Sequence, residues 1–261
     1  MTWTGTSTAG PAVSIRSDWL RQGFPADAGA PTVVCFPHAG GSAGFFAPLA
    51  EALAPAVRVL AVQYPGRLDR RGEPPLEDLR ELARRTAAAI AEDGPGIAPL
   101  AFFGHSMGSL VAYEAALLGE RGLGHTPDVL FVSGGRTPGS SRVDPAVLRS
   151  DESLIETVLR LGGTSRALLE SADLRELVMP ALRADYRALR AYTAVPGTRI
   201  GCPIIALAGS DDPVANPVEV ARWRDHTAGR FRFRVFPGDH FYLTPRLADV
   251  ADAVRAGLGI S

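Results

Sequence analysis

Short apolar runs alternate with longer amphipathic segments along most of the 261-residue chain, and this alternation constrains the fold more than any other feature. Runs such as Thr32–Phe36 (TVVCF) and Val129–Ser133 (VLFVS) are apolar almost throughout, which is typical of parallel strands covered on both faces. Strand–helix alternation with short connections predicts an α/β fold, with a mostly parallel central sheet flanked by helices. The other predicted strands are 58–63, 100–103, 203–208 and Phe231–Phe236, and the predicted helices are about 44–54, 76–92, 107–121, 216–227 and 246–257.

One segment, residues 137–195, interrupts this alternation. It contains no strand candidate, but it is strongly helical, with one helix near 153–161, a Gly162-Gly163 break and a later amphipathic helix that we expect to bend at Pro180. An inserted helical hairpin of this kind favours a lid within a single domain of residues 1–261. The alternative is that these helices only cover the core. The apolar stripe of the later helix consists of Leu174, Leu177, Val178, Leu182, Tyr186, Leu189 and Tyr192.

Composition excludes several classes of function. A net charge of −1 gives no electrostatic reason to expect a nucleic-acid partner. No run of about 18 apolar residues predicts a membrane span, and the first residues, MTWTGTSTAG, lack the pattern of a signal peptide. Cys35 and Cys202 lie in apolar runs and are predicted to be core thiols, while no CxxC pair or histidine cluster suggests a metal or redox site. We therefore expect a soluble, cytoplasmic protein.

Two serines fit the pattern G-x-S-x-G that marks the nucleophile of many hydrolases. A nucleophile elbow requires a strand that ends just before the serine and a helix that begins at it. Ser106 (GHSMG) meets this requirement, because it follows the run LAFF and precedes the helical run MGSLVAYEAALLGE. Ser42 (GGSAG) does not, because the residues PHAGG separate it from its strand. The sequence therefore favours Ser106 as the nucleophile.

The loop PHAGG at 37–41 has a different predicted role. Glycine-rich turns after an early strand bring backbone N–H groups close to a substrate carbonyl in esterases. We expect the N–H of Ala39 to pair with the N–H of Met107, the residue after Ser106, as an oxyanion hole. The alternative is an ordinary glycine-rich connection between strand and helix.

A serine nucleophile needs a general base, and the chain has five histidines. His240 (VFPGDHFYL) follows the last predicted strand, at the sheet edge where parallel α/β proteins build their sites. His105 and His38 lie inside the elbow and the PHAGG loop, and His105 should point away from Ser106. His125 and His226 follow helices in polar segments, which predicts surface positions. His240 is therefore the candidate base.

The base in turn needs a carboxylate that orients it. Asp211 and Asp212 both lie in a turn (GSDDP) between Ser106 and His240, which is the chain order of such hydrolases. Asp212 is favoured because it lies deeper in the turn and precedes a proline. Asp239 is disfavoured because it is adjacent to His240, and adjacent side chains rarely face each other.

With these pieces in place, the sequence resembles an α/β hydrolase, and more narrowly the type II thioesterases of polyketide and non-ribosomal peptide biosynthesis. One departure is VSGGRTPG at 132–139, where the family more often has a Ser/Gly-Arg pair followed by Ala-Pro, so we expect the start of the lid to differ. The stretches that carry the resemblance are CFPHAGGSA (35–43), QYPGRLDRRGEPP (63–75), FFGHSMGSLVAYE (102–114), RLGGTS (160–165), GSDDPV (209–214) and FPGDHFYL (236–243).

The resemblance implies a Ser106, His240 and Asp212 triad with an oxyanion hole of the Ala39 and Met107 N–H groups. It implies an editing enzyme that hydrolyses acyl groups from the phosphopantetheine arm of acyl or peptidyl carrier proteins through an acyl-enzyme. No metal or dissociable cofactor is implied, and we expect a monomer that binds neither nucleic acid nor membranes.

Two other functions share these sequence features. A generic carboxylesterase or lipase-like hydrolase would have the same triad, since a fold does not fix a substrate. A non-catalytic binding protein of hydrolase fold would be expected to lack part of the triad. In QYPGRLDRRGEPP, the arginines at 67, 70 and 71 suit an acidic carrier protein, but pairing with Asp69 and Glu73 is the favoured interpretation.

Overall fold

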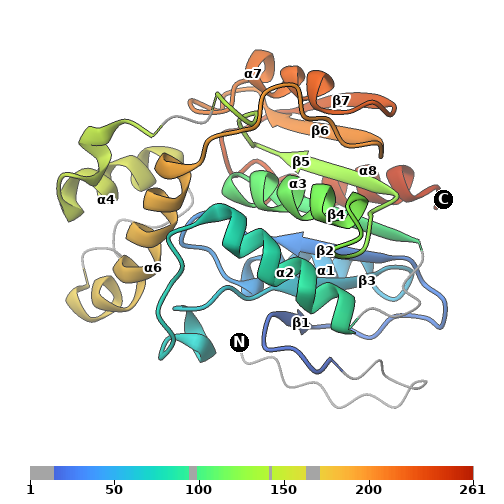
Figure 1. The fold of residues 1–261 in the computed structure, drawn as a ribbon, viewed down its shortest axis with the longest axis horizontal. Coiled ribbons are helices and arrows are strands. Elements are labelled where there is room, and N and C mark those ends of the chain that lie inside the picture. The colour runs from blue at the N-terminus through green and yellow to red at the C-terminus, as the bar shows by residue number, and fades with distance from the viewer. Residues whose placement is uncertain (1–14, 94–98, 141–142, 163–170, 261) are drawn as a thin grey trace.

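The structure is a computed structural model that describes residues 15–93, 99–140, 143–162 and 171–260, apart from the side chains of Ala172 and Leu174 (Figure 1). Its described strands form one seven-stranded sheet in the order β1-β3-β2-β4-β5-β6-β7. All neighbouring strands are parallel except β1 and β3. The strands are β1 Leu20–Gln22, β2 Thr32–Phe36, β3 Arg58–Val62, β4 Leu100–His105, β5 Val129–Ser133, β6 Ile204–Gly209 and β7 Phe231–Phe236.

The six predicted strands are therefore confirmed, and one was missed. β1 (LRQ) is a three-residue edge strand that pairs antiparallel with β3, Leu20 facing Val62. It lacks an apolar run because only Leu20 is buried. The central strands β2, β4 and β5 are buried along their whole length, whereas Arg232 to Val235 of the other edge strand, β7, are exposed.

Helices cover both faces of the sheet (Figure 1). On one face, α2 (Leu79–Asp93), α3 (Met107–Glu120) and the Trp223 side chain pack in one core cluster. On the other face, α1 (Ala47–Leu53) and α8 (Leu247–Leu258) pack against each other and the strands. The predicted helix 216–227 is divided into α7 (Pro217–Ala221) and a 3₁₀ turn over Arg222–His226. Short 3₁₀ turns also occupy Ala43–Phe46, Leu68–Arg70 and Pro145–Leu148.

The predicted helical insertion lies beside the carboxyl ends of the strands (Figure 1). It contains α4 (Asp151–Leu161), which Ser150 caps at its start and Gly162 ends at φ +83°, and α6 (Ala172–Ala191), which has Pro180 inside it. These helices share a small apolar cluster of their own, built from Leu154, Met179, Leu182 and Tyr186. Gly163 and the side chain of Leu174 lie outside the described residues.

The predicted stripe of α6 is only partly correct. Leu182, Tyr186 and Leu189 are buried, and Val178 is half-buried, but Leu177 is 54% exposed. On a helix of 3.6 residues per turn, Leu177 lies beside the buried row of α6 rather than on it. Val178 and Leu177 are thus adjacent in sequence but differ in exposure.

Candidate active site

Ser106 occupies a strained turn between β4 and α3. Its φ of 55° and ψ of −119° lie where L-residues are rarely found, as the tight strand–helix junction of a nucleophile elbow requires. A Cβ atom at Gly104 would lie 2.3 Å from the Gly108 oxygen, and one at Gly108 would lie 1.9 Å from the Phe36 oxygen. The two glycines therefore allow α3 to begin directly against β2 and β4, with the Ser106 hydroxyl at the end of the sheet.

The structure brings Ser106, His240 and Asp212 together. Because a carboxylate only accepts hydrogen bonds, His240 Nδ1–H donates to Asp212 Oδ2 at 2.7 Å. This tautomer leaves Nε2 free to accept the Ser106 hydroxyl, and the two atoms are 2.9 Å apart. His240 and Asp212 are 1% and 3% exposed, so bulk water does not compete for these bonds.

The turn that carries Asp212 holds this carboxylate in its charged form. Burial by itself raises the pKa of Asp212, but its hydrogen bonds outweigh that effect and bring the pKa below the usual range. The bonds come from His240 and from the N–H groups of Val214 and Ala215, at 2.8 and 2.9 Å from Oδ1. Asp212 is thus a fixed, ionised partner for His240.

The disfavoured candidates lie elsewhere. Asp211 is exposed and accepts the Ser210 hydroxyl at 2.7 Å. Ser42 precedes the 3₁₀ turn Ala43–Phe46, where its carbonyl accepts the Phe45 N–H. Asp239 accepts the N–H of Phe241 at 2.9 Å.

The residues predicted for the oxyanion hole lie on both sides of Ser106. His38 to Gly41 form a turn in which Gly41 N–H donates to His38 O at 2.9 Å and Gly40 has a φ of +75°, as in a type II turn. The Ala39 N–H makes no hydrogen bond to a described residue. Met107 is the first residue of α3, so its N–H has no acceptor within the helix. Both donors are therefore available to a substrate.

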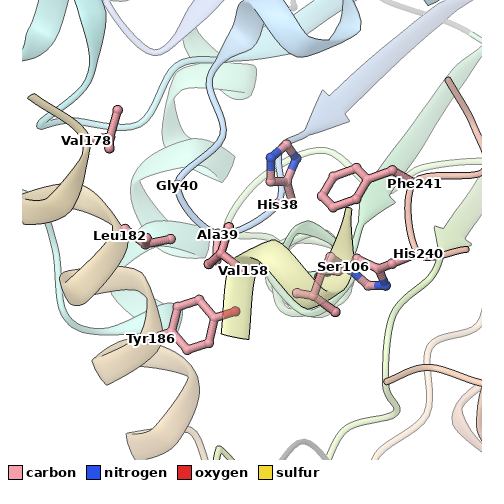
Figure 2. Close-up of a pocket in the computed structure, with 11 residues that line it drawn as sticks. His38, Ala39, Gly40, Ser106, Val158, Val178, Leu182, Tyr186, His240 and Phe241 are labelled. Carbon is pink, nitrogen blue, oxygen red and sulfur yellow. Dashed lines mark hydrogen bonds between the residues drawn. The ribbon is translucent and has the colours of Figure 1, made fainter. Parts of the chain in front are cut away.

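Two cavities meet at Ser106 and His240. The first, of about 180 Å³, lies mostly between apolar side chains of α4, α6 and Phe241. Figure 2 shows Leu182 and Tyr186 reaching from α6 toward Ala39, with Ser106 and His240 on the opposite side. The second, of about 280 Å³, is also lined largely by apolar side chains, but it adds the charged and polar side chains of Arg136, Asp144, Thr157 and Arg160. A substrate bound at Ser106 thus meets two different environments.

Two further histidines near His240, His105 and His38, are uncharged at neutral pH. His105 is fully buried, its Nδ1 lies 3.0 Å from Ser133 Oγ, and its ring lies 5.2 Å from that of His240. Burial, with a smaller effect from His240, lowers the pKa of His105 well below its ordinary value and that of His38 to about 3. His38 packs against Phe45 and Phe241.

The remaining histidines are less exposed than the sequence suggested. His125 and His226 are half-buried, and the His226 ring packs against Tyr113 and Trp223. The sequence did not indicate this packing because the neighbouring Arg224 and Asp225 are polar and exposed. Neither histidine lines a cavity that contains Ser106.

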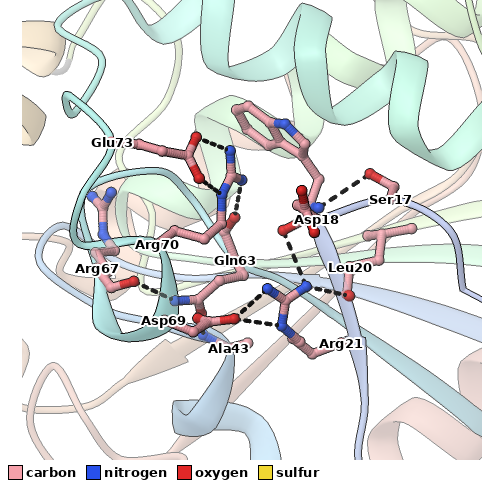
Figure 3. A network of polar contacts seen from close by, with 11 residues as sticks. Ser17, Asp18, Leu20, Arg21, Ala43, Gln63, Arg67, Asp69, Arg70 and Glu73 are labelled. Carbon is pink, nitrogen blue, oxygen red and sulfur yellow. Dashed lines mark hydrogen bonds and ion pairs between the residues drawn. The ribbon is translucent and has the colours of Figure 1, made fainter.

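The arginine-rich loop is mostly paired (Figure 3). As predicted, Arg70 binds Glu73, with an Nε to Oε1 distance of 2.7 Å. Asp69 binds Arg21 instead of a loop arginine. The buried Arg67 binds Asp185 of α6, a partner that sequence analysis missed. Arg71 is exposed.

Within the described residues, no group of three or more His, Cys, Asp or Glu side chains is arranged to bind a metal ion. Cys35 is buried and Cys202 half-buried, and both are free thiols. No described helix combines the length and apolar character needed to cross a bilayer.

Comparisons with known proteins agree with the resemblance drawn from the motifs. Residues 31–258 match the thioesterase domain family. The chain is 42% identical to a probable cadicidin biosynthesis thioesterase of Streptomyces griseus, over 92% of this chain and 66% of that protein. It is 43% identical to thioesterase PikA5 of Streptomyces venezuelae, over 90% and 84%. The type II thioesterase BorB from the borrelidin biosynthetic cluster superimposes with a TM-score of 0.81 at 40% identity, covering 97% of this chain and 99% of BorB.

The predicted fold and family are therefore confirmed. The parallel sheet, the elbow at Ser106 and the covering helices are those of an α/β hydrolase. The chain belongs to the thioesterase family, as a thioester hydrolase similar to the type II thioesterases of polyketide and non-ribosomal peptide biosynthesis.

Proposed function

We propose that this thioesterase removes acyl groups from the phosphopantetheine arm of acyl or peptidyl carrier proteins, and so clears stalled or mis-primed units. Ser106 is the nucleophile, His240 the general base and Asp212 the residue that orients His240. The observation that carries the proposal is the hydrogen-bonded series Ser106–His240–Asp212, with Ser106 placed where two unlike cavities meet.

The geometry supports acylation with two proton transfers through His240. His240 Nε2, 2.9 Å from Ser106 Oγ, takes the hydroxyl proton as Oγ attacks the thioester carbon. The negative charge that develops on the carbonyl oxygen is stabilised by the N–H groups of Ala39 and Met107. The carbon–sulfur bond then breaks, and His240 returns its proton to the departing thiolate. A thiol, with a pKa of about 8.5, is a good leaving group, so this machinery suffices without a metal.

Deacylation repeats the same steps with water. His240, neutral again, takes a proton from a water molecule that attacks the ester on Ser106. The same two N–H groups stabilise the second oxyanion, and the proton goes back to Ser106 Oγ as the carboxylic acid leaves. Asp212 stays ionised throughout, in keeping with its low pKa, and stabilises the positive charge on His240.

The two cavities suit the two ends of the substrate. The cavity under α4 and α6 has an apolar lining that fits an acyl chain. The second cavity, with Arg136, Thr157 and Arg160, suits the amide-rich arm, which carries hydrogen-bonding groups along its length. We therefore assign α4 and α6, the described helices within residues 137–195, as a lid over the acyl chain. Their separate small apolar cluster supports that role.

Other observations agree with this proposal. Relatives are named for the cadicidin and borrelidin pathways, which supports carrier-bound acyl groups as the substrate class. A single chain carries all three members of the triad, which supports action as a monomer. The free thiols of Cys35 and Cys202 agree with a reducing cytoplasm.

The test is hydrolysis of a panel of acyl-carrier proteins, from acetyl to long chains, beside matched oxygen esters. The proposal requires higher kcat/KM values on the carrier thioesters. Preference for oxygen esters would instead support a carboxylesterase. Failure of a fluorophosphonate to label Ser106 would support a non-catalytic binding protein.

A further inference from the structure

The strongest unexplained feature of the molecule is a buried ion pair that joins the lid helix to the turn beside Ser106. Asp185 of α6 is fully buried, and its Oδ2 accepts the Gly40 N–H at 2.7 Å. The same oxygen binds the guanidinium of Arg67, whose side chain is 4% exposed. Arg67 Nη1 also donates to Pro65 O at 2.8 Å. Three segments distant in sequence therefore meet at one carboxylate oxygen.

The bond to Gly40 acts on the turn that presents the Ala39 N–H. In a type II turn, the peptide between the two central residues has a fixed orientation, and here that peptide joins Ala39 and Gly40. Asp185 accepts the N–H of this peptide. Leu182, one turn earlier on α6, packs closely against Gly40, since a Cβ at Gly40 would lie 2.8 Å from the Leu182 Cδ1 atom. Helix α6 thus holds the orientation of the Ala39–Gly40 peptide.

Simple attachment of α6 does not explain these buried charges. An exposed ion pair between Arg187 of α6 and Glu77, 2.6 Å apart, already links the helix to the segment that follows the arginine-rich loop. Asp185 Oδ1 and Arg67 Nε are buried and have no hydrogen-bond partner among the described residues. Burying a pair of charges costs free energy, and apolar residues often fill such a place with equal or greater stability.

We propose that Asp185, with Arg67 as its counter-ion, is a positioning residue for the oxyanion hole. Its carboxylate fixes the Ala39–Gly40 peptide so that the neighbouring Ala39 N–H is aimed at the developing oxyanion. This inference rests on the oxyanion hole of the proposed function, and it makes catalysis depend on the position of α6. An opened lid carries Asp185 away and leaves the oxyanion hole incomplete.

The experiment compares two double variants that both lack the buried charges. The asparagine pair, Asp185→Asn with Arg67→Met, keeps a carbonyl oxygen that accepts the Gly40 N–H. The leucine pair, Asp185→Leu with Arg67→Met, has a side chain of similar size at this position and no acceptor. Arg187→Ala is the matched control on the same helix. The substrate is a short acyl thioester of N-acetylcysteamine, which needs no carrier protein.

We expect the leucine pair to have a kcat about tenfold to a hundredfold below that of the asparagine pair, with KM values within about twofold. A trifluoromethyl ketone, which forms an oxyanion adduct with Ser106, should bind the leucine pair more weakly by the same factor. A purely structural role would lower the melting temperature or the active fraction without changing this inhibition constant. Arg187→Ala should leave kcat unchanged.

Equal kcat values and equal inhibition constants in the two double variants would overturn the inference, and so would a loss of kcat in Arg187→Ala as large as that in the leucine pair. If the leucine pair does not fold, Asp185→Val with Arg67→Met replaces it. The proposed function fails separately, if the wild-type protein hydrolyses the small thioester but not acyl-carrier proteins.

Discussion

Replacing Val178 with phenylalanine should narrow the range of acyl groups that the enzyme accepts. Val178 is half-buried on α6 and lines the apolar cavity that reaches Ser106. A benzyl group in place of the isopropyl group displaces about four methylenes of a long acyl chain, each contributing about 0.8 kcal/mol when buried. A complete displacement therefore costs about 3 kcal/mol, or roughly a hundredfold in kcat/KM. Because Val178 is half-buried, part of the ring faces solvent, and we expect about tenfold to a hundredfold.

The assay is the ratio of kcat/KM for a long acyl-carrier to that for acetyl-carrier. Acetyl groups stay close to Ser106 and should be hydrolysed as before. Leu177→Phe is the control, because Leu177 is the preceding residue and is 54% exposed. It should leave the ratio unchanged. If Val178→Phe lowers the melting temperature but not the ratio, or if both variants change the ratio equally, α6 covers the core and does not shape the acyl site.

Three further predictions address Asp212, the glycine at the end of the elbow, and the buried His105. Asp212→Asn should lower kcat by about 10⁴-fold and Asp211→Asn by less than about threefold, because only Asp212 fixes the His240 tautomer; equal steady-state losses would contradict the assignment. Gly108→Ala should destabilise the fold by more than about 3 kcal/mol, since its Cβ meets a backbone oxygen of β2, whereas Gly72→Ala, with open space around it, should stay within about 0.5 kcal/mol in urea unfolding. The pKa of His105 is lowered by burial, so below its unfolded value of about 6.5 only the unfolded chain takes up this proton, which costs about 1.4 kcal/mol per pH unit. The free energy of unfolding should therefore fall less steeply from pH 6 to pH 4 in His105→Gln than in the wild type, and parallel slopes would refute this.

Sequence reasoning selected the three side chains that the structure joins by hydrogen bonds, because each carries a local signal. Ser106 follows a continuous apolar strand and begins a helix, and that context separates it from Ser42. His240 and Asp212 follow the last two strands, so parallel topology alone brings them to the edge where Ser106 lies. The longer strands and helices were predictable for the same reason. Each carries its own local signal, an apolar run or an amphipathic spacing.

The features that sequence reasoning missed depend on contacts between distant segments. Arg67 and Asp185 are 118 residues apart, and nothing near Arg67 distinguishes it from Arg70, which binds the neighbouring Glu73. β1 is too short to show an alternating pattern of apolar residues, and it is recognisable as a strand only from its pairing with β3. The exposure of Leu177 depends on how α6 is rotated about its own axis, which apolar spacing alone does not fix.

The central claim is that a carrier-bound acyl group passes through Ser106. The most direct measurement is rapid-quench mass spectrometry of the protein mixed with an acyl-carrier protein, followed by mapping of the acylated peptide. We predict an acyl-enzyme on the peptide that contains Ser106, no adduct and no hydrolysis with Ser106→Ala, and a normal adduct with Ser42→Ala. An acyl group on another residue, or hydrolysis by Ser106→Ala at the wild-type rate, would contradict the account.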